Sequence, residues 1–289
     1  MQDSGRETTD VPASPWPLAA GRRRCARLLI SCATVLSVAG VAGSTAAGAA
    51  STTTTTVATP LRLPKSGKCT ILEIGDSLGT DLGGGLSHQL EKSPKIRLIL
   101  EGKSSTGLSN SGFYNWPQHL KTFLAQYHPQ LTILLLGGND EQGIIVNGRA
   151  AAFDTTPWRK QYAKNVAAMM DETTKAGSAV LWIGMPIMYP NGYRQGIQVI
   201  NSIFAKVAKA KQRVTFLPTW KFFANSKGQF RFSAMVDGVQ QAIRTSDGIH
   251  PTAVGQNVLA TYVVQELKIL YGLSVKPAYP EIFTSKSAR

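Results

Sequence analysis

Short apolar runs alternate with longer segments of helical periodicity along most of the chain. The runs are nearly continuous in Ile, Leu and Val, and they lie at 69–74, 96–100, 131–136, 180–184 and 214–217. Runs of this kind are typical of strands that are buried on both faces. The segments between and after them favour helices, at 82–91, 116–127, 158–175, 195–211 and 253–271. This alternation predicts an α/β fold of three layers, α/β/α, with a five-stranded parallel sheet.

One further element is expected before the last helix. Residues 222–232 contain the turn sequence Asn225-Ser226-Lys227-Gly228 between aromatic positions, which favours an inserted β-hairpin. No internal repeat interrupts the order of strands and helices.

The N-terminal fifty residues have the layout of an export signal. A polar leader precedes a basic block at Arg22, Arg23, Arg24 and Arg27, and an apolar stretch at 28–41 ends in small residues. Gly, Ser and Thr interrupt the apolar stretch, so 1–50 is either a cleaved signal peptide or a membrane anchor through 28–50. We therefore expect an exported protein of the extracellular space or cell envelope, with a Thr/Pro-rich linker at 51–68 and one folded domain at 69–289.

Charge and cysteine content narrow the class of protein. The net charge is +14, and because five of the 31 basic and three of the 17 acidic residues precede Ser51, the remainder carries +12. A protein with this positive charge favours anionic partners, an anionic cell wall among them. The basic residues are scattered and no aromatic-rich basic motif occurs, so no nucleic-acid partner is expected. Cleavage of the signal would leave Cys69 alone, which excludes a disulfide scaffold and indicates a buried thiol.

Polar, Gly-rich segments follow three of the predicted strands and precede the last helix. They are Gly75-Asp76-Ser77-Leu78, residues 102–107, Gly137-Gly138-Asn139-Asp140 and Asp247-Gly248-Ile249-His250. Ligands of open parallel sheets bind beyond the carboxyl ends of the strands, so these segments are expected to meet. A serine hydroxyl needs a neighbouring base, and the oxyanion that it generates needs fixed donors. Ser, His, Asn and Gly amides supply these parts, and Asp247 can orient the imidazole of His250.

In this order the four segments resemble the blocks of the SGNH hydrolase superfamily, the GDSL esterases and lipases. The resemblance covers about residues 69–273 and implies a flavodoxin-like SGNH fold. It implies Ser77 as nucleophile and Asp247 and His250 as its catalytic partners. The implied oxyanion hole consists of the Ser77 amide, the Gly107 amide and the Asn139 side chain, with Asp76 and Asp140 organising the loops. Ser104-Ser105-Thr106-Gly107 departs from the family pattern, and together with residues 113–117, 181–186 and 246–250 it resembles a largely uncharacterised branch of exported bacterial members.

Other candidate sites are weaker. Gly83-Gly84-Gly85 lacks the spacing of a phosphate-binding loop and suits close packing of a helix on the sheet. No set of His, Cys, Asp and Glu has metal-ligand spacing, so neither cofactor nor metal is expected. Arg244 either binds an anionic acceptor as a substrate-binding residue or faces solvent. Aromatic residues are candidates either for a carbohydrate-binding cleft or for core packing: Trp116, Trp158, Tyr189, Tyr193 and Trp220.

Three classes of function remain, of which the third is a membrane-anchored structural protein that keeps its signal uncleaved. The first is acyl-ester chemistry: a serine esterase that acts on an acetyl or other short acyl ester of a cell-envelope carbohydrate, or an O-acyltransferase to a polysaccharide. The second is a non-catalytic module that binds glycans on an SGNH scaffold. The expected partners are a small acyl ester or acylated glycan, and the expected state is a monomer.

Overall fold

A computed structural model describes residues 68–189, 191–273 and 275. The signal or anchor predicted at 1–50 and the linker predicted at 51–68, apart from Lys68, lie outside these residues. Of the part described, no helix is both long and apolar enough to cross a membrane.

The central sheet contains five parallel strands, as predicted. They are β1 (Cys69–Gly75), β2 (Ile96–Leu100), β3 (Leu131–Leu135), β6 (Ala179–Ile183) and β7 (Val214–Leu217), in the spatial order β2-β1-β3-β6-β7. Parallel pairing sets Ile71 opposite Leu98 on one side and Leu131 on the other. The chain runs from β1 to β2 in one direction and returns to β3 on the other side of β1. This reversal makes the carboxyl ends of β1 and β3 the expected place for a ligand.

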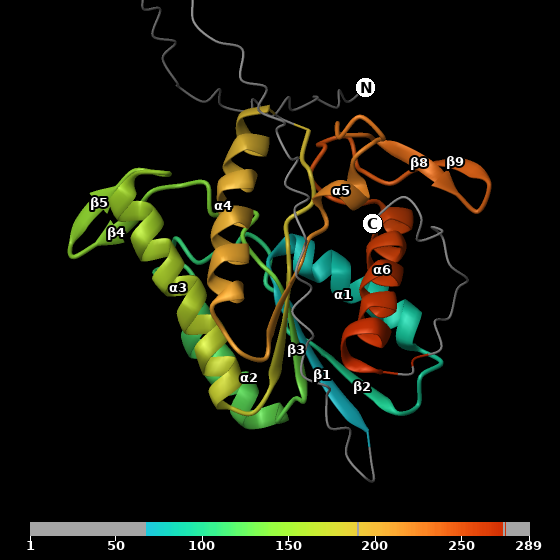
Figure 1. The fold of residues 1–289 in the computed structure, drawn as a ribbon, viewed down its shortest axis with the longest axis horizontal. Helices are drawn as coiled ribbons and strands as arrows, with labels where there is room; N and C mark the ends of the chain where they lie inside the picture. The colour runs from blue at the N-terminus through green and yellow to red at the C-terminus, as the bar shows by residue number, and fades with distance from the viewer. Residues whose placement is uncertain (1–67, 190, 274, 276–289) are drawn as a thin grey trace, which may run out of the picture. The chain divides into compact units, whose positions relative to one another are not determined.

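Helices cover both faces of the sheet (Figure 1). On one face α1 (Ser77–Leu90) packs against α6 (Ala253–Tyr271), and on the other α3 (Thr156–Lys175) lies between α2 (Trp116–Tyr127) and α4 (Asn191–Lys209). The α/β/α architecture is therefore confirmed. The core between the layers includes the fully buried rings of Trp116, Trp158 and Trp182. Trp116 and Trp158 are thus core residues, and Cys69 is a buried free thiol, as expected.

The start of α1 differs from the prediction. The helix begins at Ser77, five residues before the predicted start at Leu82, because Asp76 caps it by accepting a hydrogen bond from the Leu78 amide at 3.0 Å. The first turn contains Gly79, Thr80 and Asp81, which have low helix propensity, so this start is not visible in the sequence. Thr252 caps α6 in the same way through the Gly255 amide.

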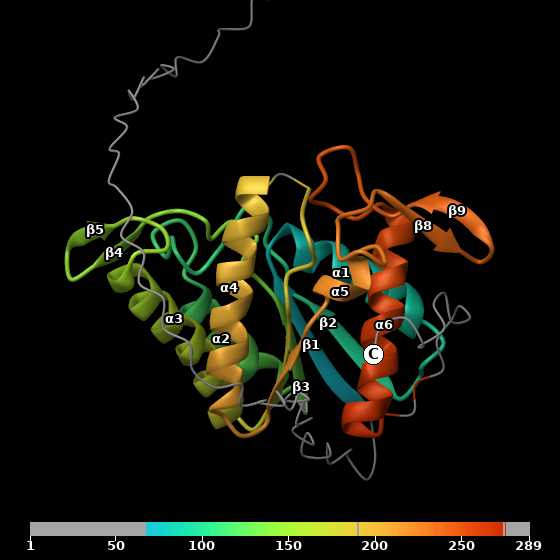
Figure 2. The ribbon, with the colours of Figure 1, turned by 45° about the horizontal axis from the view of Figure 1, so that its top comes forward.

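Two hairpins lie at the end of the sheet that carries the strand carboxyl ends (Figure 2). They are β4 (Ile144–Val146) with β5 (Arg149–Ala151), and β8 (Ser233–Val236) with β9 (Val239–Ala242). Asn147-Gly148 and Asp237-Gly238 form their turns with positive φ at both positions, as two-residue hairpin turns require.

The hairpin predicted at 222–232 is wrong. The short helix α5 (Trp220–Phe223) occupies its start, and a single bridge between Ala224 and Phe230 closes the turn. The Asn225 side chain accepts hydrogen bonds from the Lys227 and Gln229 amides, so it stabilises a compact loop instead of two paired strands. The regular hairpin begins just beyond, at the Asp237-Gly238 turn.

Candidate active site

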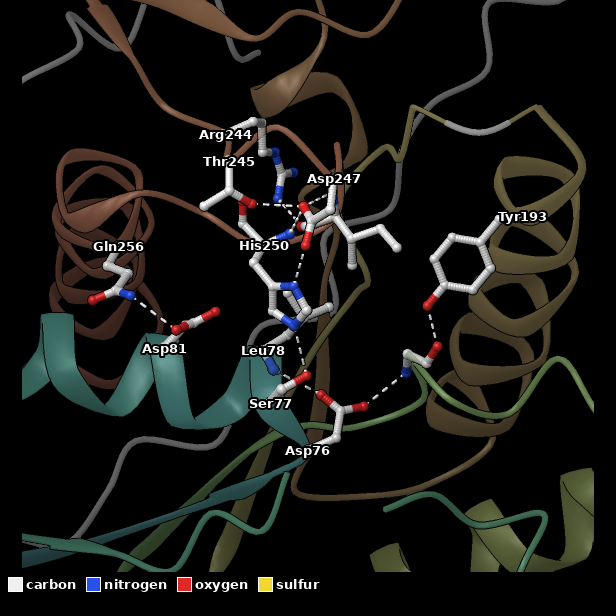
Figure 3. A network of polar contacts seen from close by, with 12 residues as sticks. Asp76, Ser77, Leu78, Asp81, Tyr193, Arg244, Thr245, Asp247, His250 and Gln256 are labelled. Atoms are coloured by element: carbon white, nitrogen blue, oxygen red, sulfur yellow. Dashed lines mark hydrogen bonds and ion pairs between the residues drawn. The ribbon is translucent and has the colours of Figure 1, made fainter. Parts of the chain in front are cut away.

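Ser77 lies at the carboxyl end of β1, as the first residue of α1. Its hydroxyl oxygen is 2.9 Å from Nε2 of His250, and Nδ1 of His250 is 2.7 Å from Oδ2 of Asp247 (Figure 3). With the proton on Nδ1, the imidazole donates to Asp247 and its Nε2 accepts from Ser77. The structure therefore brings three side chains from two distant parts of the chain into one relay of hydrogen bonds.

The loop before α6 holds Asp247 and His250 in place. Oδ1 of Asp247 accepts hydrogen bonds from the Ile249 amide at 2.8 Å, the His250 amide at 3.0 Å and the Thr245 hydroxyl at 2.6 Å. Gly248 has a φ of +69°, which lets the chain turn between the two side chains. Burial raises the pKa of Asp247, but hydrogen bonds from His250, Thr245 and the two amides outweigh it and hold the pKa well below its usual range. Asp247 is therefore a carboxylate at neutral pH.

Asp76 connects the nucleophile to the loop after β3. Its Oδ2 accepts hydrogen bonds from the Gly137 amide at 2.9 Å and the Gly138 amide at 2.7 Å. Burial raises the pKa of Asp76 to about 6, against the lowering effect of these amides and that of Leu78. Tyr193 donates to the Gly138 carbonyl from α4 (Figure 3). The loop that carries Asn139 is thus held from two sides.

Asp140 links the same loop to the segment that contains Gly107. It is fully buried and accepts hydrogen bonds from the Ser109 amide and hydroxyl, both at 2.8 Å, and from the Tyr162 hydroxyl at 2.6 Å. A side chain at Gly107 would collide with this carboxylate, so the close approach requires glycine there. The Asn139 side chain donates to the Thr106 carbonyl at 2.9 Å. Gly107 and Asn139 therefore lie together, although the sequence around Gly107 is irregular.

Arg244 does not face solvent, which was one of its two predicted placements. It is 3% exposed and donates to the backbone carbonyls of Ile249 at 2.8 Å and Ile187 at 3.3 Å. Its guanidinium also lies over the Phe223 ring. Burial lowers the pKa of Arg244 to about 10, so it stays charged beneath the loop that carries His250. Contact with an anionic acceptor stays a prediction.

Sequence reasoning missed two side chains around His250. Thr245 donates to Asp247, as described above. Asp81 lies on α1, one turn after Ser77, and accepts from Gln256 at 2.8 Å through Oδ1, while its Oδ2 is out of solvent with no partner among the described residues. It lies beside His250 in Figure 3, and its electrostatic interaction with His250 lowers the Asp81 pKa against the larger effect of burial. A second carboxylate is thus available to stabilise an imidazolium.

A cavity of about 830 Å³ opens beside this network. Polar and apolar atoms contribute nearly equally to its surface. The polar side chains of the lining are Ser105, Asn110, Asn139, Glu141, Gln142 and Tyr193, and the apolar ones are Phe113 and Ile249. The size of the cavity lies in the range of small-molecule sites. The three other histidines have structural surroundings, since His88 pairs with Asn257, His119 stacks on Tyr114 and His128 ends α2. Within the described residues no cluster of His, Cys, Asp and Glu could hold a metal ion.

The chain is similar in sequence to a known esterase and in fold to solved hydrolase structures. The chain is 29% identical over 205 residues to the esterase TesA of Pseudomonas aeruginosa, an alignment that covers 70% of this chain and 89% of TesA. A crystal structure of a putative acylhydrolase from Bacteroides fragilis matches with a TM-score of 0.51 and 14% identity, over 72% of this chain and 91% of that one. The crystal structure of an α/β hydrolase enzyme from the metagenome of Lake Arreo, Spain, matches with a TM-score of 0.53 and 15% identity, over 71% of this chain and 97% of that one.

The two solved structures show the fold, and TesA is a distant esterase homologue. A family model described as "Protein of unknown function (DUF459)" matches residues 70–266, which is more than half of the chain. The protein therefore belongs to the DUF459 family and has an SGNH/GDSL hydrolase-like fold.

Proposed function

We propose that this protein is a serine esterase that cleaves short acyl esters, acetyl above all, from a cell-envelope carbohydrate. The observation that carries the proposal is the continuous hydrogen-bond relay from Ser77 through His250 to Asp247. It lies beside an open cavity and within a fold shared with an esterase homologue.

In the first half of the reaction, the Ser77 hydroxyl attacks the ester carbonyl as His250 Nε2 takes its proton. The carbonyl oxygen becomes an oxyanion, which the amides of Ser77 and Gly107 and the Asn139 side chain stabilise. The bond to the alcohol then breaks, and His250 returns the proton to the departing alkoxide. The products of this half are the free alcohol and an acyl group on Ser77.

In the second half, His250 takes a proton from water, and the resulting hydroxide attacks the acyl-Ser77 carbonyl. Ser77 leaves with the proton from His250, and the carboxylic acid is released. If a sugar hydroxyl replaces water in this step, the same residues perform O-acyl transfer.

The test is turnover of p-nitrophenyl acetate by the purified protein, together with mass spectrometry of the peptide that contains Ser77. We expect release of p-nitrophenol, a transient mass increase of one acetyl group on Ser77, and loss of both in Ser77→Ala. Ser202→Ala, an exposed serine on α4, is the matched control and should behave as the wild type. Addition of an unacetylated glycan separates the two reactions, because only a transferase moves the acetyl group to it. Absence of turnover and of acetyl-Ser77 would exclude both.

Location and partners form part of the proposal. An export signal within 1–50 would place the enzyme where envelope polysaccharides occur, and the basic charge of the remainder suits an anionic wall polymer. Sequencing the N-terminus of the mature protein tests the export step: a start near Ser51 supports cleavage, and an intact N-terminus supports a membrane anchor.

A further inference from the structure

Three aromatic rings lie together near the catalytic loop, the residues 244–250 that carry Asp247 and His250, and two of the three rings are open to water. Tyr189, Phe230 and Phe232 pack on one another with ring centroids 4.8 to 5.4 Å apart. Tyr189 is nevertheless 54% exposed and Phe232 39% exposed. Phe230 packs against the hydrophobic core and supports the two exposed rings. Exposed aromatic side chains that pack on one another indicate a binding surface. We call these three residues the aromatic surface.

The aromatic surface is attached directly to the backbone around Asp247 and His250. The Tyr189 amide donates to the Gly248 carbonyl at 3.1 Å, and Gly248 lies so close to the Tyr189 ring that no side chain fits there. The Phe232 carbonyl accepts from the amides of Ile243 and Arg244, at 2.8 and 3.1 Å, just before the catalytic loop. The aromatic surface therefore has a fixed position next to the reacting groups.

The cavity adjoins the same loop. Ile249, the residue after Gly248, lines this cavity together with Asn139 and Glu141. Burial raises the pKa of Glu141, and its Oε2 is out of solvent without a partner among the described residues. This oxygen faces Gly196 of α4, so a ligand that offers hydroxyl groups would instead meet the polar lining side chains, Ser105, Asn110 and Gln142 among them.

We propose that the alcohol part of the substrate is an oligosaccharide chain, which binds the polar side chains of the cavity with its hydroxyl groups and stacks sugar rings on Tyr189 and Phe232. Sugars combine polar edges with apolar faces. They therefore match a site in which the loop of Asp247 and His250 has polar side chains of the cavity near it and the aromatic surface beside it. A long acyl chain would leave the polar side chains of the cavity without hydrogen-bond partners, so it matches this site less well than a glycan. The inference rests on the proposed function and names the site that would recognise the glycan.

Hydrolysis of a length series gives the first test. We use chemically O-acetylated glucose oligosaccharides, from glucose to the hexamer, and divide kcat/KM for each by that for p-nitrophenyl acetate. This ratio should rise with chain length, and Phe232→Ala should lower the ratio for the hexamer by about tenfold, as loss of one stacked ring implies. Ile269→Ala removes an exposed side chain from α6 and serves as the control, with no expected change. A ratio that is independent of chain length, or unaffected by Phe232→Ala, would overturn the inference.

Binding without turnover gives the second test and separates this inference from the proposed function. Calorimetry with Ser77→Ala and the unacetylated hexamer should show binding that is tighter than for glucose and that weakens when Phe232→Ala is added. Binding without acetyl-Ser77 in the wild type would contradict the esterase but support the glycan site. Turnover of p-nitrophenyl acetate without hexamer binding would support the esterase and contradict the glycan site. Two further assays compare the wild type with Phe232→Ala: binding to phosphatidylglycerol vesicles and dimerisation in solution. If Phe232→Ala abolishes vesicle binding but not glycan binding, the aromatic surface binds a membrane. If it abolishes dimerisation but not glycan binding, the aromatic surface binds a second copy of the chain.

Discussion

Asp76 and Asp247 are carboxylates of one site, but their surroundings shift their pKa values in opposite directions. Asp247 is partly exposed and receives four hydrogen bonds, which hold its pKa low. Asp76 is fully buried, and this burial dominates the three amides that donate to it. The first is thus suited to stabilise a positive charge on His250, and the second to fix the loop that carries Asn139.

Asp247→Asn should leave Ser77 and His250 in place but lower kcat. The neutral amide no longer stabilises the imidazolium, and we expect a loss of about 10²- to 10⁴-fold in kcat with little change in KM. Steady-state kinetics with p-nitrophenyl acetate measures this. Asp237→Asn, in the exposed turn between β8 and β9, is the control, since Asn also adopts its positive φ. A kcat within threefold of the wild type would contradict a role for Asp247.

Asp76 should produce a pH dependence of stability. Its pKa of about 6 in the folded state lies above the ordinary value of 3.8, so between these pH values the folded state binds more protons than the unfolded state. The free energy of unfolding contributed by Asp76 therefore falls as the pH rises from about 4 to about 6, and is constant above. Urea unfolding across this range should show the decline in the wild type relative to Asp76→Asn. Parallel curves would show that Asp76 has an ordinary pKa.

Single residues also show where sequence reasoning ends. Ser77, Asn139, Asp247 and His250 could be proposed as candidate site residues because each stands in a short motif after a strand or before a helix. Thr245 and Asp81 could not, since their contacts depend on how the 244–250 loop folds over α1. The burial of Arg244 likewise arises from tertiary packing on Phe223.

At the scale of elements, the packing of α1 on α6 sets the distance between Ser77 and His250. Gly85 faces α6, and a Cβ there would lie 2.5 Å from the Gln256 carbonyl oxygen. Gly84 is exposed, with nothing nearer than 3.5 Å. The prediction that the 83–85 glycines serve close helix packing on the sheet therefore holds for Gly83, which lies against Glu73 of β1, whereas Gly85 packs on α6 instead.

Gly85→Ala should destabilise the protein by about 1–3 kcal/mol through overpacking, and lower kcat because α6 and His250 shift. Gly84→Ala has room and should be neutral or stabilise by about 0.5–1 kcal/mol. Urea unfolding and kinetics of the two variants, side by side, measure the difference. Equal stabilities would mean that α1 and α6 do not require the glycine contact.

The elements were predictable to different degrees. Buried parallel strands have an apolar run that few other elements share, and all five were identified from it. The β4–β5 and β8–β9 hairpins are short and lack such runs, and their Asn-Gly and Asp-Gly turns were the available signal. The start of α1 depended on one capping side chain, Asp76.

For the molecule as a whole, the alternation of strands and helices in the sequence predicted the layers. The strand order β2-β1-β3, known from the structure, then shows that the candidate site lies where the order of strands reverses next to β1. The choice of substrate depends on side chains from separate loops, which no linear pattern reports. Charge is the property that the sequence does give directly, with +12 beyond the first fifty residues.

This charge predicts salt-dependent binding to anionic polymers. Binding to polygalacturonate should be detectable at about 0.01 M salt, where the screening length is about 30 Å, and lost near 1 M, where it is about 3 Å. Co-sedimentation over a salt series, with neutral dextran as the control, measures it. Equal binding to both polymers, or no effect of salt, would contradict an electrostatic contact.

In the proposed reaction, His250 and Asp247 make Ser77 a nucleophile. The most direct test is the rate at which a serine-reactive fluorophosphonate labels the protein, with the labelled residue identified by peptide mass spectrometry. We expect one label, on Ser77, and a rate that falls at least about a hundredfold in His250→Ala. Labelling of another residue, or equal rates in the wild type and His250→Ala, would contradict the proposed active site.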